Sequence, residues 1–302
     1  MSLHHQDIHQ GRLLHIGCVC CRPENAGCSD LEQTSSNTVA FPLHGVFIKH
    51  HAHGAEVVAH IGQALFFNAG ETYRVSHPVG SGDDCLVLRA EEEVLRDILA
   101  EHDARRAEHD GHPFRSTHVA LVPEIELQRS LLWHGLRNRE ASILEVETRG
   151  LSLLSAVMAR ISPDGSRDAH GASRRTRRRE QSHAVAVLLA DQPERDWNLD
   201  ELARRVHASP YHLARSFRAA LGEPIHRYQL RMRLALALEK ILDSSIALTT
   251  LAMELGFATP SHFTAAFGRA YGVTPSALRK QARPTQAYEL RKILTAARNG
   301  AH

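Results

Sequence analysis

A repeat near the C-terminus constrains this chain more than any other feature of its sequence. The segments 199–222 and 248–272 each hold a short apolar helical pattern, a break and a second helical pattern. Matched positions carry similar residues, namely Ser209-Pro210 with Thr259-Pro260, His212 with His262, Leu213 with Phe263, Phe217 with Phe267, and Gly222 with Gly272. A period near fifty residues indicates one structural unit used twice. The sequence therefore predicts two helix-turn-helix units.

The signals for helix ends agree with this interpretation. One apolar stripe is spaced i, i+3, i+4, i+7 and consists of Leu199, Leu202, Ala203 and Val206. Asn198 and Glu201 have the spacing of a capping box at its start. Ser209 is a favourable N-cap, and Pro210 fits the first helical position, where no donor is lost. Gly222 is suited to the left-handed residue that ends a helix.

The segment that joins the two units is predicted to be a long helix. It runs from Pro224 to about Leu242 with apolar residues throughout. A helix of about 19 residues is about 28 Å long at 1.5 Å per residue. Successive major-groove faces on one side of B-DNA lie about 34 Å apart. One chain can therefore place both second helices in adjacent grooves.

With these features, residues 181–283 resemble the DNA-binding domain of the AraC/XylS transcriptional regulators. The resemblance rests on four motifs, Ser-Pro-Tyr-His-Leu at 209–213, Gly256-Phe257, Ser261-His262-Phe263 and Gly272-Val273-Thr274-Pro275. It implies an all-α domain with two helix-turn-helix units joined by a long helix. It also implies double-stranded DNA and RNA polymerase as partners, and an effector-responsive activator rather than a repressor.

The predicted DNA contacts differ between the two units. Burial of Leu213 and Phe217 leaves five side chains toward the groove, Tyr211, His212, Ala214, Arg215 and Arg218, and the resemblance places base contacts at Tyr211, Ala214 and Arg215. The second unit offers Ser261, His262 and Thr264, which can make short hydrogen bonds but no bidentate fork. We expect the first unit to supply most of the specificity and the second mainly to anchor. The alternative is that the arginines contact only phosphate.

The charge distribution divides the chain in the same way. Residues 1–162 carry a net charge of −7, whereas residues 163–283 carry +7. An acidic sensor joined to a basic nucleic-acid reader fits this asymmetry. Residues 163–180 lack an apolar period and are rich in arginine, which predicts a flexible basic linker. Residues 284–302 form a C-terminal tail.

Other classes of protein find little support in the sequence. The first ten residues are polar, and no stretch approaches 18 apolar residues, so we expect a cytoplasmic protein without a membrane partner. No Ser/His/Asp grouping, phosphate loop or paired-carboxylate motif is recognisable. The protein is therefore not expected to be an enzyme.

The N-terminal part is predicted to combine strands and helices. Residues 38–90 contain short β-rich runs separated by glycines, which is typical of a small antiparallel barrel. They resemble the cupin-like domain of the same regulators. A helical pattern follows at 91–99, and two antiparallel helices are expected within 123–161. Their surplus apolar surface predicts a homodimer, the alternative being that it packs within one chain. The fold class is thus α+β.

Two sets of residues are candidates for ligand binding in the N-terminal part. Tyr73 and His77 alternate onto one strand face and could line an effector cavity, or could be ordinary core residues. Four cysteines lie close together in the sequence, Cys18, Cys20, Cys21 and Cys28. In a reducing compartment such a cluster favours a metal ion or redox chemistry over a structural disulfide. A thiol- or metal-dependent sensor, an Ada-like DNA repair protein and incidental free thiols remain open alternatives.

Overall fold

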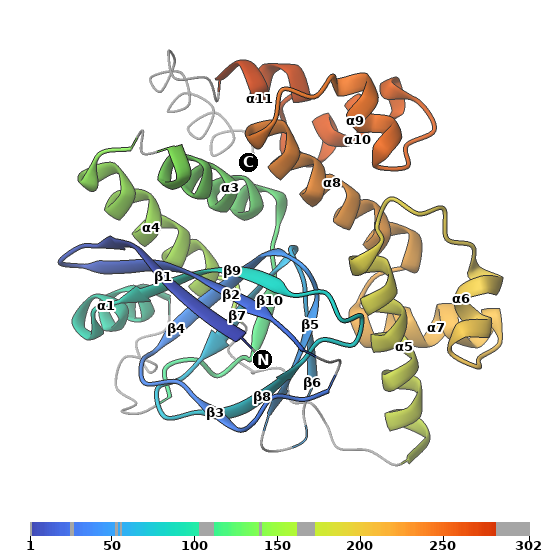
Figure 1. Ribbon diagram of the computed structural model, residues 1–302, viewed down its shortest axis with the longest axis horizontal. Coiled ribbons are helices and arrows are strands. Elements are labelled where there is room, and N and C mark those ends of the chain that lie inside the picture. Colours follow the sequence, from blue (N-terminus) through green and yellow to red (C-terminus); the bar gives the residue numbers. More distant parts are fainter. Residues whose placement is uncertain are drawn as a thin grey trace.

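The computed structural model describes residues 2–24, 27–51, 54, 56–102, 112–138, 141–161 and 173–281. The N-terminal part contains two antiparallel sheets (Figure 1). The larger sheet has the order β1-β2-β9-β4-β7-β10, with β1 at Ser2–Gln10, β2 at Leu14–Arg22, β9 at Asp83–Ala90, β4 at Thr38–His44, β7 at Gln63–Phe67 and β10 at His118–Ala120. The smaller sheet has the order β3-β8-β5-β6, with β3 at Glu32–Gln33, β8 at Thr72–Ser76, β5 at Phe47–His51 and β6 at Glu56–Ala59.

The two sheets share a small apolar core. Phe47 and Val57 from the smaller sheet pack with Leu65, Phe67 and Val87 from the larger one. The other face of the larger sheet is also covered, so β4 and β7 are buried on both faces. A strand buried on both faces reads as a continuous apolar run. This explains why the run that forms β7 was recognisable in the sequence.

Three helices cover the outer face of the larger sheet. These are α1 at Glu92–His102, α3 at Pro123–Asn138 and α4 at Ile143–Met158. Their buried residues pack on Leu14, Phe41 and Leu88 of the sheet. The predicted helical stripe at 91–99 and the predicted helix pair within 123–161 are therefore confirmed.

The hairpin of β1 and β2 was not predicted. Strand β1 is polar and largely exposed, so the sequence gives no alternating apolar face there. Strand β2 pairs with both β1 and β9, which places the cysteine-rich segment inside the larger sheet.

Between residues 173 and 281 the secondary structure is helical, as predicted. Its helices are α5 at Ser173–Asp191, α6 at Leu199–Arg205, α7 at Pro210–Leu221, α8 at Ile225–Asp243, α9 at Leu248–Glu254, α10 at Pro260–Tyr271 and α11 at Pro275–Gln281. In Figure 1, α8 runs from the unit containing α6 and α7 to the unit containing α9 and α10. Among the described residues, none of the helices has the length and apolar content needed to span a membrane.

Three details of the sequence interpretation need correction. The basic segment was expected to be a flexible linker up to residue 180, but helix α5 already begins at Ser173, because arginine is a good helix former. Leu199 is 39 % exposed and is not part of the buried stripe. The Glu201 carboxylate accepts from Arg195 and Arg205 rather than closing a capping box. The remaining linker residues and the tail beyond 281 lie outside the described residues.

The apolar surplus of α3 is covered within the chain. Leu127 and Leu131 of α3 belong to the same core as Leu238 of α8 and Phe267 of α10. Close by, the Tyr271 hydroxyl donates to the Glu126 carboxylate at 2.9 Å. This part of the argument for a homodimer was wrong, since the second domain occupies that surface. The exposed apolar residues left on the helix pair are Ile143 and Leu144.

Candidate nucleic-acid interface

The two predicted reading helices, α7 and α10, begin and end in the same way. The Ser209 hydroxyl accepts from the His212 amide at 3.4 Å, and the Thr259 hydroxyl accepts from the His262 amide at 3.1 Å. A proline follows each cap at the start of the helix. Each helix ends at a left-handed glycine, with φ of 79° in the first unit and 68° in the second. The caps fix where each helix begins and ends, because they satisfy backbone groups that the helix itself leaves unpaired.

Burial then selects the face that each helix presents. Leu213 and Phe217 of α7 are fully buried, as are Phe263 and Phe267 of α10. Of the eight predicted contact residues, Ala214 is half-buried. The other seven are exposed, namely Tyr211, His212, Arg215, Arg218, Ser261, His262 and Thr264. The structure thus gives each helix a polar face that is free to meet a groove.

Known proteins similar to this chain also contain helix-turn-helix domains. Residues 202–281 match the family model described as a helix-turn-helix domain. The HTH-type transcriptional regulator MtrA from Neisseria gonorrhoeae is 33 % identical over 102 residues, which are 33 % of this chain and 33 % of that protein. A putative AraC-like transcription regulator from Streptomyces antibioticus is 30 % identical over 101 residues, again 33 % of each chain. Residues 202–281 form an AraC-type helix-turn-helix domain.

The family model covers residues 202–281, which is about a quarter of the chain. The chain spans about a third of the length of the curated relatives it matches. Among solved structures, an apo variant of ToxT from Vibrio cholerae strain SCE256 aligns over 89 % of this chain and 98 % of its own, at 9 % identity and a TM-score of 0.39. The chain therefore carries a domain of the kind found in transcriptional regulators, joined to a domain whose role has to be argued from its own residues.

Arg233 of α8 fixes the two units of the AraC-type domain relative to each other. Its guanidinium donates to the carbonyl oxygens of Pro193 and Arg195, just before α6, and to that of Gly256, just after α9. Gly256 has φ of +73°, and a Cβ there would lie 2.1 Å from the Glu194 carbonyl oxygen. Only glycine allows this approach. The sequence resemblance included Gly256 but gave no signal for Arg233.

A second support surrounds Trp197, which precedes α6. Its indole donates to the Gln192 carbonyl at 3.0 Å, and the Arg195 guanidinium lies 4.1 Å from the ring centre. Arg205 lies on the same ring at 5.1 Å. Glu201 joins the two arginines by ion pairs. This cluster orients the first helix of the unit. Its members lie within residues 192–205, but its contacts join α6 to the loop that precedes it, so helical periodicity could not reveal them.

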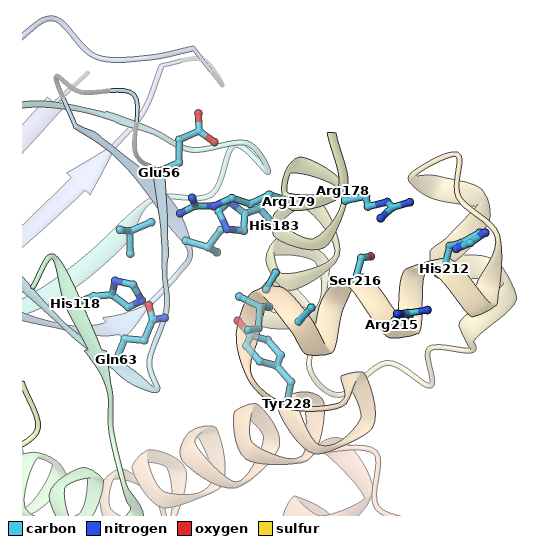
Figure 2. A pocket seen from close by; sticks show the side chains of 15 residues that line it. Glu56, Gln63, His118, Arg178, Arg179, His183, His212, Arg215, Ser216 and Tyr228 are labelled. Carbon is cyan, nitrogen blue, oxygen red and sulfur yellow. The ribbon is translucent and has the colours of Figure 1, made fainter. Parts of the chain in front are cut away.

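The first reading helix borders a hollow of about 670 Å³ between the domains (Figure 2). The N-terminal domain contributes Glu56 and Val58 of β6, and α5 contributes Arg178. His212 and Arg215 of α7 lie on its edge. Beside the hollow, Val46 and Val58 of the N-terminal domain belong to the same buried core as Leu213 and Phe217 of α7, so the N-terminal domain helps to position the first reading helix.

A separate cavity of about 370 Å³ lies within the N-terminal domain. Tyr73 lines it, together with apolar residues such as Val19 and Phe67 and the charged Arg89, and its predicted role in ligand binding stays a prediction. His77 is not among its lining residues. The His77 ring instead bonds the Asp83 carboxylate at 2.6 Å, in a fully buried position. The paired assignment of Tyr73 and His77 to one cavity is therefore wrong for His77, because β8 ends at Ser76.

The four clustered cysteines do not converge on one site. Cys18 and Cys20 share one face of β2, with their sulfurs 3.7 Å apart, whereas Cys21 lies on the opposite face. Cys28 is exposed and pairs with Ser76 on β8. A single ion bound by all four thiols is excluded by this arrangement.

The environment of these thiols also opposes nucleophilic chemistry. Burial, with the neighbouring Cys20 second, raises the pKa of Cys18 to about 12. Burial and the nearby Asp83 raise the pKa of Cys21 to about 11. Reactive cysteines need the opposite, a pKa lowered by positive charge. An Ada-like repair function through Cys18 or Cys21 gains no support from the structure.

Proposed function

We propose that this protein is a sequence-specific regulator of transcription that binds double-stranded DNA through both helix-turn-helix units. The observation that carries the proposal is the pair of identically capped helices, α7 and α10, with exposed polar faces and a rigid connection through α8 and Arg233. Helix α8 has 19 residues and is thus about 28 Å long. This length suits two adjacent major grooves on one side of the duplex.

The effector-responsive part of the proposal rests on the N-terminal domain. The 370 Å³ cavity combines apolar walls with the polar groups of Tyr73 and Arg89, which is the usual make-up of a small-molecule site. We propose that a small-molecule effector occupies it and that the protein acts as an activator in contact with RNA polymerase. The two facing sheets support a cupin-like architecture. A homodimer through residues 123–161 stays a prediction, with Ile143 and Leu144 as its exposed apolar residues.

The proposal is tested by selecting duplexes from a randomised library with the purified full chain. We expect a preferred sequence to emerge, because exposed side chains on two helices can reach base edges. Binding to that sequence should weaken steeply with salt, with a slope of about −0.9 for each phosphate contacted. Fluorescence anisotropy against salt concentration measures this. A selected pool that is indistinguishable from the starting library would overturn the proposal.

A further inference from the structure

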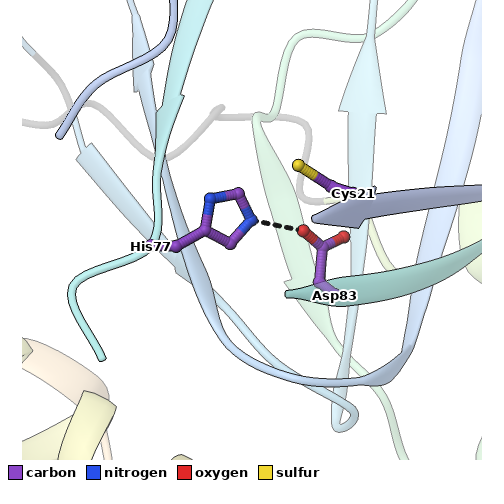
Figure 3. A group of neighbouring side chains, drawn as sticks. All are labelled: Cys21, His77 and Asp83. Carbon is purple, nitrogen blue, oxygen red and sulfur yellow. Dashed lines mark hydrogen bonds and ion pairs between the residues drawn. The ribbon is translucent and has the colours of Figure 1, made fainter. Parts of the chain in front are cut away.

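Three buried side chains from distant points of the N-terminal domain meet beside its cavity, which two of them line. They are Cys21 on β2, His77 just after β8 and Asp83 at the start of β9 (Figure 3). One ligand atom of each lies within 4.8 Å of the other two. Within the described part of the chain, this is the group of three such residues that comes close enough to hold a metal ion.

The backbone holds these residues in place. Cys21 and Asp83 are directly opposite each other in the antiparallel pairing of β2 and β9, so their side chains leave the same face of the sheet. Gly82, before Asp83, packs so closely that a Cβ there would lie 2.2 Å from the Cys21 carbonyl oxygen. The turn between β8 and β9 then brings His77 against Asp83, with 2.6 Å between ring nitrogen and carboxylate oxygen. Strand register thus positions Cys21 and Asp83, and the turn after β8 positions His77.

The spacing fits a tetrahedral ion after a small adjustment. Zinc binds sulfur at about 2.3 Å and nitrogen or oxygen at about 2.0–2.2 Å, so adjacent ligand atoms are about 3.3–3.8 Å apart. The His77–Asp83 distance would need to open by less than about 1 Å, which side-chain rotation provides. The Cys85 thiol donates to the other oxygen of Asp83 at 3.3 Å. Such a second bond orients a carboxylate ligand.

The chemistry of the three groups also suits a divalent cation. A thiolate, an imidazole and a carboxylate are the usual zinc ligands, and with Cys21 deprotonated this set would carry two negative charges in a buried place. A bound divalent cation would balance that charge and keep the thiol deprotonated. Cys21 and Asp83 also line the 370 Å³ cavity. A fourth coordination position would therefore face the cavity.

We propose that Cys21, His77 and Asp83 form a zinc site with three protein ligands and one position open to the N-terminal cavity. Water or a ligand in the cavity completes the coordination. The site is independent of the DNA-binding role, because its residues make none of the contacts assigned to the reading helices. It also differs from the four-cysteine cluster that the sequence suggested, of which it keeps only Cys21.

Cobalt(II) reports on this site, because a cobalt–thiolate bond gives a charge-transfer absorption that histidine-only binding does not. The untagged full chain should bind one equivalent of Co²⁺ with that absorption, and Zn²⁺ should displace it. Cys21→Ser should lose the absorption. Cys18→Ser, a buried cysteine three residues away on the same strand, is the matched control and should keep it. Binding without the absorption, as at the exposed histidines of β1, would count against the site.

A second measurement needs no variant. X-ray absorption of the zinc-loaded wild-type chain should show one sulfur at about 2.3 Å and the remaining ligands at about 2.0–2.2 Å. A coordination shell without sulfur overturns the proposal, and so does cobalt–thiolate absorption that persists in Cys21→Ser. If that variant fails to fold, as judged by circular dichroism, the absorption spectrum of the wild type decides alone.

Discussion

Replacing Arg129 with methionine is expected to lower the free energy of unfolding by about 3–5 kcal/mol, because it leaves a buried carboxylate without its partner. The Arg129 side chain is fully buried between the two domains. Its guanidinium bonds Glu239 of α8 at 2.6 Å and the carbonyl oxygens of Pro42 and Ile61 at 3.0 and 3.1 Å. One residue thus ties α3 to the larger sheet and to the helix between the two reading units. Urea unfolding followed by tryptophan fluorescence measures the change.

The chain contains a matched control for this prediction. Arg137 joins the same two helices by an ion pair with Asp243, but its side chain is 47 % exposed. Arg137→Met should therefore cost at most about 1 kcal/mol, since water screens an exposed pair. The double variant Arg129→Met with Glu239→Leu should recover part of the loss, because it removes the orphaned charge. Equal effects of Arg129→Met and Arg137→Met would show that the buried pair has no special role.

Replacing Arg215 with alanine is expected to relax the sequence preference at one or two base pairs of the operator. Arg215 is exposed on α7, one turn beyond the capped start of the helix. An arginine fork on guanine O6 and N7 contributes about 1–3 kcal/mol of discrimination, which is a factor of about 5–150 in affinity. Repeating the duplex selection with Arg215→Ala should show the affected positions directly.

The second unit supplies the comparison. Ser261→Ala and Thr264→Ala on α10 should weaken binding more evenly across sequences, because neither side chain makes a bidentate contact. Both residues are exposed, so neither change should alter the core. If Arg215→Ala lowers affinity without changing the preferred sequence, Arg215 contacts phosphate and the assignment of α7 as the main reading helix is wrong.

The C-terminal domain was largely predictable because its signals are local. Caps, apolar stripes and terminal glycines lie within a few residues of the helices that they define. Because the unit is repeated, most of these signals occur twice in the sequence. The contacts that join the units were not predictable. Arg233 reaches carbonyl oxygens about 23 and 38 residues away along the chain, and no periodicity encodes such contacts.

The N-terminal site was harder to predict for the same physical reason. Proximity in sequence suggested one group of cysteines, but the two-residue period of a strand sends Cys20 and Cys21 to opposite faces. The residues that do meet, Cys21, His77 and Asp83, are brought together by the pairing of β2 with β9. That pairing joins two strands that lie far apart in the sequence, so spacing along the chain does not indicate it.

The most direct test of the central claim is the dependence of binding on the spacing between the two recognised elements. If α8 holds α7 and α10 on one side of the duplex, the selected sequence should contain two elements about 10–10.5 base pairs apart, one helical turn. Inserting half a turn, about 5 base pairs, between them should remove the contribution of the second element, because it turns that element to the opposite side of the DNA. Inserting a full turn provides the distance control. Fluorescence anisotropy that shows unchanged affinity after the half-turn insertion would contradict the account.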